Sequence, residues 1–207
     1  MTDTPDHGPL KADNEAPRKR VALRPRLASD AEALFPTMSD PEMMRWWSRA
    51  PFETVEELHA YFAPDDGSSW RSWAIVRAGD DQAIGFVASG QKREGVAEIG
   101  YLLAKDAQGR GYAREALTLL IHQLFAEGQR RIFADVDPDN QPSIALLNAL
   151  GFTREGCLRA EWSTHIGLRD SLIYGLLAEE WSARNGMPAK AEGSLGKARA
   201  PAGSPLA

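Results

Sequence analysis

A glycine-containing turn, Gln108-Gly109-Arg110-Gly111-Tyr112-Ala113, stands between a segment with the pattern of a strand and one with the pattern of a long helix. The start of a helix presents backbone N–H groups that have no acceptor within the helix, together with the positive end of the helix dipole. Glycine lets such a turn approach a bulky anion, because it carries no Cβ. The turn therefore predicts a phosphate or diphosphate site. The alternative is a glycine turn that only joins a strand to a helix.

Two better-known phosphate-binding loops do not match this turn. The P-loop requires Gly-Lys-Ser/Thr after its glycines, and no such sequence follows Gly111. The dinucleotide-binding fingerprint requires glycine or alanine at the position that Arg114 occupies. Both of these loop classes are therefore excluded.

The segment after the turn has the clearest pattern in the chain. Apolar residues of Tyr112–Glu127 recur at helical spacing, and Gly128 is a suitable stop signal. A strand is expected at Arg131–Val136. Residues 95–136 thus form a strand, a helix and a strand, and the two strands should be parallel.

The remaining elements alternate in type. Capping patterns predict helices that begin at Ser29 and Thr54, the first of them limited by Pro36. A helical turn is expected from Pro41, and Asn140 can cap a later helix. Further strands are expected at Val21–Pro25, Ser72–Ala78, Ala83–Ser89, Gly95–Ala104, Thr153–Ile166 and Ser171–Ala178, with turns at Gly79–Asp81, at Gly90–Glu94 and near Gly167. The fold class is mixed α/β, with a largely antiparallel start and one parallel crossover.

Composition separates a central domain from two tails. Residues 1–20 are polar and mixed in charge, and fifteen of the 22 residues of Gly186–Ala207 are alanine, glycine, proline or serine. Such segments bury too little apolar surface to offset the entropy lost on ordering. We expect a disordered tail at 1–20, one domain at 21–184 and a flexible tail at 185–207.

Composition and charge exclude several classes of protein. Hydrophobic residues make up 43% of the 207 residues and charged residues 26%, as in ordinary soluble domains. The net charge of −5 gives no basic field for nucleic acid, and no apolar run approaches the roughly 20 residues of a membrane-spanning helix. No secretory signal is visible, and the single cysteine, Cys157, is expected to be a small packed residue. We expect a cytoplasmic, metal-free protein without a nucleic-acid or membrane partner.

Gln108, Gly111 and Ala113 resemble the Gln-x-x-Gly-x-Gly/Ala acyl-CoA diphosphate motif of the GNAT N-acetyltransferases. Over residues 21–181 the chain resembles the ribosomal-protein N-terminal (RimJ/RimL-like) acetyltransferase branch of this family. It implies a mostly antiparallel central sheet of about seven strands, a parallel β-α-β cofactor unit and flanking helices. Its other matching segments are Leu23–Pro25, Ser39–Glu42, Ala97–Tyr101, Pro138–Ser143, Leu150–Phe152, Glu155-Gly156 and Leu176–Trp181.

The resemblance also implies acetyl-CoA as co-substrate, without a metal. In this family the strands before and after the long helix splay apart, and the pantetheine arm pairs with the backbone of the first. Asn140 is expected to hydrogen-bond this arm, in place of or in addition to capping its helix. The cofactor-binding residues implied are Leu102, Leu103, Gln108, Gly109, Arg110, Gly111, Tyr112, Ala113 and Asn140.

Direct acetyl transfer needs a group that removes a proton from the attacking amine, because an amine of pKa about 8–10 is mostly charged at neutral pH. By resemblance, Glu98 or Glu161 is this base, directly or through water; the alternative for each is an exposed or hydrogen-bonded strand glutamate. Many relatives have a tyrosine that serves as the general acid at the position where this chain has Leu147. In this branch Ser143 is its substitute. Ser143 would hydrogen-bond the leaving thiolate or only stabilise its helix, and an N–H near Leu103 would hold the oxyanion.

Three functions of different classes are compatible with these residues. The first is an acetyl-CoA-dependent N-acetyltransferase that acts through a ternary complex on a primary amine, either a protein N-terminus or a small molecule. The second is a non-catalytic acyl-CoA-binding sensor or scaffold, and the third is a binder of nucleotide phosphates. Glu98, Glu161 and Ser143 favour the first, and a homodimer is compatible with it.

Overall fold

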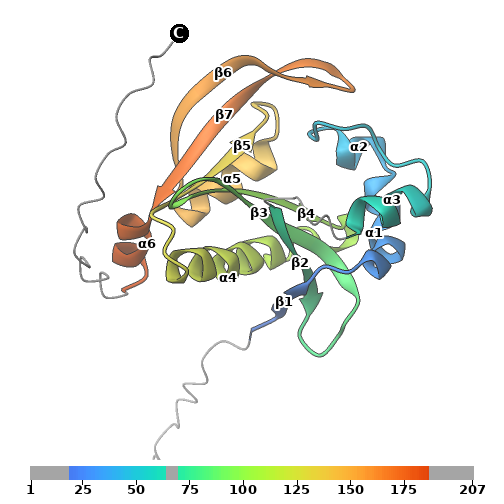
Figure 1. Cartoon of the computed structure of the whole chain (residues 1–207), viewed down its shortest axis with the longest axis horizontal. Coiled ribbons are helices and arrows are strands. Elements are labelled where there is room, and N and C mark those ends of the chain that lie inside the picture. Colours follow the sequence, from blue (N-terminus) through green and yellow to red (C-terminus); the bar gives the residue numbers. More distant parts are fainter. Residues whose placement is uncertain (1–18, 64–69, 187–207) are drawn as a thin grey trace, which may run out of the picture. The chain divides into compact units, whose positions relative to one another are not determined.

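The computed structural model describes residues 19–63 and 70–186 (Figure 1). Within these residues seven strands form one sheet in the order β1-β2-β3-β4-β5-β7-β6. Strands β4 and β5 are parallel, and the pairs β1–β2, β5–β7 and β6–β7 are antiparallel. The predicted fold class, a mostly antiparallel sheet of about seven strands with one parallel unit and flanking helices, is therefore confirmed.

The strands are β1 Val21–Pro25, β2 Trp70–Arg77, β3 Ala83–Arg93, β4 Val96–Leu103, β5 Arg131–Val136, β6 Thr153–Thr164 and β7 Gly167–Leu177. The α-helices are α1 Ala31–Met38, α2 Pro41–Met44, α3 Val55–Phe62, α4 Tyr112–Ala126, α5 Gln141–Leu150 and α6 Ala178–Arg184. Two short 3-10 turns, Ala28–Asp30 and Lys105–Ala107, complete the list.

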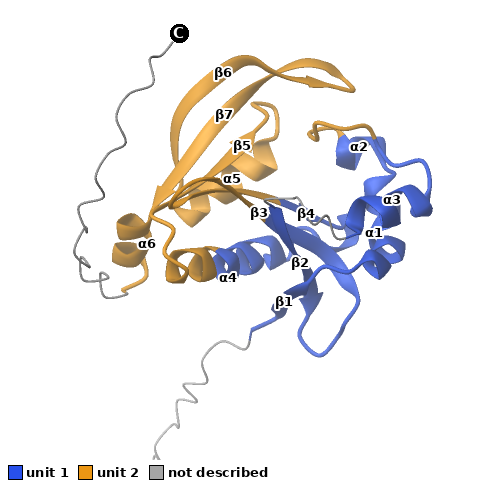
Figure 2. Cartoon of the chain, in the orientation of Figure 1, with its two compact units in different colours: residues 1–44, 51–88, 101–120 blue, residues 45–50, 89–100, 121–207 orange. Residues whose placement is uncertain are grey.

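The chain divides into two compact units, which are coloured separately in Figure 2. Unit 1 consists of residues 1–44, 51–88 and 101–120, and unit 2 of residues 45–50, 89–100 and 121–207. Strands β3 and β4 and helix α4 each contribute residues to both units. The predicted tails lie mostly outside the described residues.

In unit 1 the helices between β1 and β2 bury apolar side chains in a common core. Leu34, Met38 and Leu58 are fully buried. Phe62 packs edge-to-face on Phe86 of β3 with ring centroids 6.0 Å apart. The predicted cap of α3 is confirmed, because the Thr54 side chain accepts a hydrogen bond from the Glu57 N–H.

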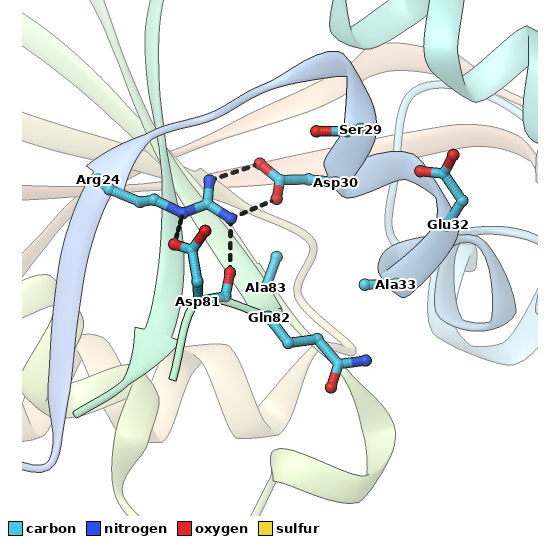
Figure 3. A pocket seen from close by; sticks show the side chains of 8 residues that line it. All are labelled: Arg24, Ser29, Asp30, Glu32, Ala33, Asp81, Gln82 and Ala83. Atoms are coloured by element: carbon cyan, nitrogen blue, oxygen red, sulfur yellow. Dashed lines mark hydrogen bonds and ion pairs between the residues drawn. The ribbon is translucent and has the colours of Figure 1, made fainter. Parts of the chain in front are cut away.

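Arg24 joins three segments of unit 1 through ion pairs (Figure 3). Its Nη1 and Nη2 atoms donate to the two carboxylate oxygens of Asp30 at 2.9 and 2.6 Å, and its Nε donates to Asp81 at 2.6 Å. Asp30 is buried, with its side chain 5% exposed. The Asp30 carboxylate, followed by that of Asp81, raises the pKa of the Arg24 guanidinium above its usual range, against the opposing effect of burial. Arg24 therefore ties β1 to the 3-10 turn and to the β2–β3 turn.

The predicted start and end of the first helix are wrong. Asp30 is the N-cap of α1, and its carboxylate accepts the Leu27 N–H and the Arg24 guanidinium and does not cap the helix. Pro36 lies inside α1, which ends at Met38. Since only the N–H of residue 36 is missing, the helix loses one hydrogen bond close to its end and continues for two residues.

In unit 2 the first residues of β4 pair in parallel with β5, from Val96↔Arg131 to Glu98↔Phe133. This confirms the predicted strand–helix–strand arrangement. The connecting helix α4 begins at the predicted Tyr112, and five residues of its apolar stripe are fully buried. They are Ala116, Leu117, Leu120, Ile121 and Leu124.

Three further details differ from the predictions. Strand β3 continues through Gly90 to Arg93, so the turn expected at Gly90–Glu94 is shorter and lies at the positive-φ residue Gly95. The strand residues after Gly90 are exposed and polar, and they therefore have the composition of a turn. Helix α6, which follows β7, was not predicted. Cys157 is an exposed free cysteine, since it lies on the exposed strand β6, and not a packed residue.

Candidate active site

The turn before α4 has the geometry of an anion-binding loop. Gly109 and Gly111 adopt left-handed backbone conformations, with φ of +73° and +78°. The hydrogen bond from the Glu115 N–H to the Gly111 carbonyl, 3.2 Å, is the first of the helical type. The N–H groups immediately before Glu115 therefore have no acceptor within the helix. They stand at the positive end of the helix dipole, where an anion is stabilised.

Gln108 fixes this loop to the end of β4. Its side-chain Nε2 donates to the Leu103 carbonyl oxygen at 3.0 Å, and it also lies 3.8 Å from Met43 Sδ. Gln108 itself has an extended backbone, between the 3-10 turn and Gly109. The structure thus brings the predicted residues Leu103 and Gln108 into direct contact within unit 1.

Arg20, the last residue of the predicted N-terminal tail, contacts the same loop. Its Nη1 donates to the Arg110 carbonyl oxygen at 2.9 Å, and its guanidinium lies 5.5 Å from the centroid of the Tyr112 ring. Its Nε and backbone N donate to the carboxylate of Glu115 at 3.1 and 2.6 Å. Arg20 therefore compensates the negative charge in the first turn of α4, which would otherwise repel a bound anion. The signal in the sequence is weak: a basic residue directly before the first strand.

The backbone of β4 at Leu102 and Leu103 is packed closely against β3. A Cβ at Gly85 would collide with the Leu102 carbonyl oxygen and would lie 3.0 Å from Leu103 Cα. The Ala104 N–H donates to the Ile84 carbonyl oxygen at 2.8 Å. Within the described residues the parallel register of β4 with β5 covers Val96–Glu98, the first three residues of the strand.

In unit 2, Glu98 is held by an ion pair. Its Oε2 lies 2.8 Å from the Nζ of Lys92, and its side chain is 17% exposed. The carboxylate thus has a defined position near the middle of β4, four residues before Leu102. This contact fits the alternative given for Glu98, a hydrogen-bonded glutamate on a strand.

Asn140 and Ser143 lie together at the start of α5. The Asn140 side-chain oxygen accepts the Ser143 N–H at 3.2 Å, which confirms the predicted helix cap. The preceding loop is fixed by Arg169 of β7, which donates to both carboxylate oxygens of Asp137 at 2.7 and 2.8 Å. Burial alone would raise the pKa of Asp137, but the hydrogen bonds from Arg169 and from the Asp139 N–H, together with the charge of Arg169, outweigh it and hold that pKa below its usual value.

Glu161 lies in an irregular stretch of β6. The register with β7 jumps from Leu158↔Ser171 to Trp162↔Arg169, so that residues 159–161 face the single residue Asp170. Ala160 has a positive φ of 51°, and its N–H donates to the Asp170 carboxylate at 2.8 Å. Such bulges redirect side chains and are frequent beside active sites. Glu161 is exposed on this bulge, whereas Asn140 and Ser143 lie together at the start of α5.

The described part of the chain contains neither a metal-ligand cluster nor a membrane-spanning helix. No cluster of three or more His, Cys, Asp or Glu side chains suited to a metal ion occurs there. No helix in that part is long and apolar enough to span a bilayer.

Comparison with known proteins defines the family. Residues 20–153 match the family model of the acetyltransferase (GNAT) domain. The uncharacterised N-acetyltransferase p20 of Bacillus licheniformis is 33% identical over 171 residues, which cover 79% of this chain and 96% of the relative. A probable GNAT-family acetyltransferase from Chromobacterium violaceum has a similar crystal structure, with a TM-score of 0.72 and 26% identity, covering 88% of this chain and 100% of that one. The chain belongs to the GNAT acetyltransferase family and is an N-acetyltransferase by that membership.

A more distant structure shares the fold. Spermidine N-acetyltransferase from Vibrio cholerae, solved in complex with CoA and spermine, has a TM-score of 0.67 and 22% identity over 78% of this chain and 98% of that one. That protein thus binds CoA together with an amine.

Proposed function

We propose that this protein transfers the acetyl group of acetyl-CoA directly to a primary amine, with both substrates bound at once. The observation that carries the proposal is the loop before α4. It combines N–H groups without intrahelical acceptors, two positive-φ glycines and the Arg20 guanidinium at one helix start. These features fit the diphosphate of CoA, which needs several donors and a positive potential.

The residues of unit 1 have binding roles in this proposal. The N–H groups of Gly109–Ala113 hold the diphosphate, and Arg20 offsets the charge of Glu115. The Gln108 side chain fixes the loop to Leu103. The backbone of Leu102 and Leu103 pairs with the pantetheine arm.

The residues of unit 2 have the catalytic roles. Acetyl-CoA supplies a thioester as the acetyl donor. Glu98 removes a proton from the ammonium form of the acceptor, directly or through water, with Glu161 as the second candidate for this role. Ser143 hydrogen-bonds the thiolate sulfur as the C–S bond breaks, and Asn140 hydrogen-bonds the pantetheine arm while it caps α5.

The substitution Gly111→Val tests the binding role of the loop. A branched side chain is strained at φ +78°, and it would displace the Arg20 guanidinium, whose Nη2 lies 3.2 Å from a Cβ at this position. We expect the dissociation constant for acetyl-CoA to rise about tenfold or more, because this factor corresponds to the loss of one charge-assisted hydrogen bond. Isothermal titration calorimetry measures it.

Gly79→Val is the matched control. Gly79 has a similar φ of +83° in the β2–β3 turn, with open space around a Cβ, so that it carries the same backbone strain away from the loop. Its acetyl-CoA affinity should equal that of the wild type. If Gly111→Val bound acetyl-CoA with the affinity of the wild type, the loop assignment would be refuted. If the wild type bound acetyl-CoA but released no CoA with any amine, the non-catalytic acyl-CoA-binding sensor would be favoured.

A further inference from the structure

One face of the sheet in unit 2 carries both the candidate base Glu98 and a second carboxylate, that of Asp135. In the parallel pair of β4 and β5, Glu98 lies opposite Phe133, so these two side chains point to the same face. Side chains alternate along a strand, so Asp135 lies on this face as well, about 7 Å further along β5. The alternate residues Ile132 and Ala134 are buried on the opposite face. Asp135 is therefore a neighbour of the candidate base within unit 2.

The Asp135 carboxylate is held in place by two neutral donors, one from β6 and one from β7. Its Oδ2 accepts a hydrogen bond from the indole Nε1 of Trp162 at 2.8 Å, and its Oδ1 accepts one from the Ser171 hydroxyl. Asp135 itself is half-buried, and Trp162 is 41% exposed. Since a carboxylate oxygen can accept more than one hydrogen bond, both oxygens can bind a further donor without losing these contacts.

Asp135 differs from neighbouring carboxylates in having no positively charged partner. Glu98 is paired with Lys92 at 2.8 Å, and Asp137 is paired with Arg169 at 2.7 Å. Among the residues that the structure describes, no lysine, arginine or histidine forms an ion pair with Asp135. A carboxylate that is partly removed from water gains most from a cation beside it. The negative charge of Asp135 is therefore available to a bound cation.

The indole ring of Trp162 adds a second attraction for a cation. Trp162 directly follows the bulge at residues 159–161, where the register of β6 shifts so that Trp162 lies opposite Arg169. Its N–H is bonded to Asp135, which places the ring next to the carboxylate. The face of an indole ring attracts ammonium and guanidinium groups, and a carboxylate hydrogen-bonds them. The pair therefore suits a cation and disfavours an anion.

We propose that Asp135 and Trp162 bind a second positively charged group of the acceptor, so that the preferred substrates are primary amines that also carry an ammonium or guanidinium group. This inference rests on the proposed function and names the substrate class of that site. The reacting amine lies at Glu98 and the second cation at Asp135, on the same face of the sheet. Small dicationic amines and peptides with a basic residue next to the N-terminus share this chemistry.

The test uses the full-length protein and pairs of acceptors that have the same shape and one reactive amine but differ in charge. The small-molecule pair is 4-guanidinobutylamine and its neutral urea analogue. The peptide pair carries arginine or the neutral citrulline directly after the N-terminal residue. CoA release gives kcat/KM for each acceptor. In the wild type we expect the charged member of at least one pair to be preferred by about 10- to 100-fold, which corresponds to one hydrogen bond between charged groups. The pair that shows the preference identifies the source of the acceptor.

Asp135→Asn should bring this ratio close to one, because it keeps the shape of the side chain and removes its charge. The KM for acetyl-CoA should stay unchanged. Trp162→Phe keeps an aromatic ring but loses the N–H that fixes the carboxylate, so it should retain part of the preference. Glu179→Gln is the matched control, because it removes one negative charge from an exposed position of α6. It should keep the wild-type ratio.

The two acceptors of a pair are compared within one variant, so a partly unfolded Asp135 variant does not imitate the effect. A ratio close to one for both pairs in the wild type would overturn this inference alone. A preference that Asp135→Asn leaves unchanged would overturn it as well. No CoA release with any amine would overturn the proposed function together with the inference.

Discussion

Glu98 and Glu161 differ in how firmly the structure holds their carboxylates. Glu98 is largely buried and ion-paired with Lys92 at 2.8 Å. Glu161 is exposed and follows the positive-φ residue Ala160 in a bulge. A base must be held within hydrogen-bonding reach of the proton it removes, directly or through one water. The better-positioned carboxylate is therefore that of Glu98.

We predict that Glu98→Gln lowers kcat by about 100-fold or more, because general-base catalysis contributes factors of this size. The acetyl-CoA KM should change little, since Gln has the same shape and Glu98 is not assigned to the cofactor. Steady-state kinetics across pH measures both parameters. Glu94→Gln, which removes an exposed carboxylate four residues earlier, should behave as the wild type. If Glu98→Gln keeps full kcat and Glu161→Gln loses it, the base is Glu161.

At the residue level, the sequence predicted what depends on local geometry. Gly111 and Gln108 could be identified because a helix start and its glycines follow from neighbouring residues. Arg20 and Arg24 could not, since the contacts of Arg20 with Glu115 and of Arg24 with Asp81 join residues 57 or more positions apart. Their importance comes from partners that only the folded chain brings near.

At the level of elements, segments with a clear local pattern were predicted well, whatever their length, and boundaries that depend on distant contacts were not. Helix α4 and strands β1 and β5 have the expected bounds or differ by one residue. The predicted cap at Ser29 failed because Ser29 lies inside the 3-10 turn Ala28–Asp30, which places Asp30 at the N-cap of α1. The bulge at Ala160 has no local signal, because it is defined by which β7 residues the strand faces.

The loop before α5 gives a prediction about pH. The folded-state pKa of Asp137 is depressed by Arg169, so its contribution to stability is full above the unfolded pKa of about 3.9 and is lost as pH falls through the folded pKa. We expect Asp137→Asn to lower the free energy of unfolding by about 2 kcal/mol near neutral pH. The difference from the wild type should shrink below about pH 4, as the carboxylate is protonated. Denaturant titrations at several pH values measure it.

Asp139→Asn is the control for that experiment. Asp139 also contacts Arg169, at 2.5 Å, but its side chain is 64% exposed, whereas that of Asp137 is 7% exposed. Water screens an exposed pair, so this substitution should cost less than about 1 kcal/mol. A gap between wild type and Asp137→Asn that stays constant from neutral to acidic pH would contradict the assignment.

On the scale of the whole molecule, the candidate residues are divided between the two units. Unit 1 contains Leu102, Leu103 and the loop from Gln108 to Ala113, together with Arg20. Unit 2 contains Glu98, Asn140, Ser143 and Glu161. Apart from Asn140, which is proposed to hold the pantetheine arm, these residues of unit 2 are assigned to catalysis and those of unit 1 to binding, so substitutions in the two sets should affect different measurements.

Ligand-dependent stability tests the binding part in the intact chain and separates it from nucleotide binding. A ligand that binds only the folded state stabilises it by about 2.7 kcal/mol at 100 times its dissociation constant. For a protein of this size we expect acetyl-CoA to raise the melting temperature by roughly 5–10 °C. Gly111→Val should lose about half of this shift or more at the same concentration, since a tenfold weaker ligand stabilises by only about 1.4 kcal/mol, and Glu98→Gln should keep it. ATP shares the phosphates but lacks the pantetheine arm that would pair with Leu102 and Leu103, so it should protect less. A larger shift with ATP than with acetyl-CoA would make the loop a nucleotide site and remove the basis for acetyl transfer.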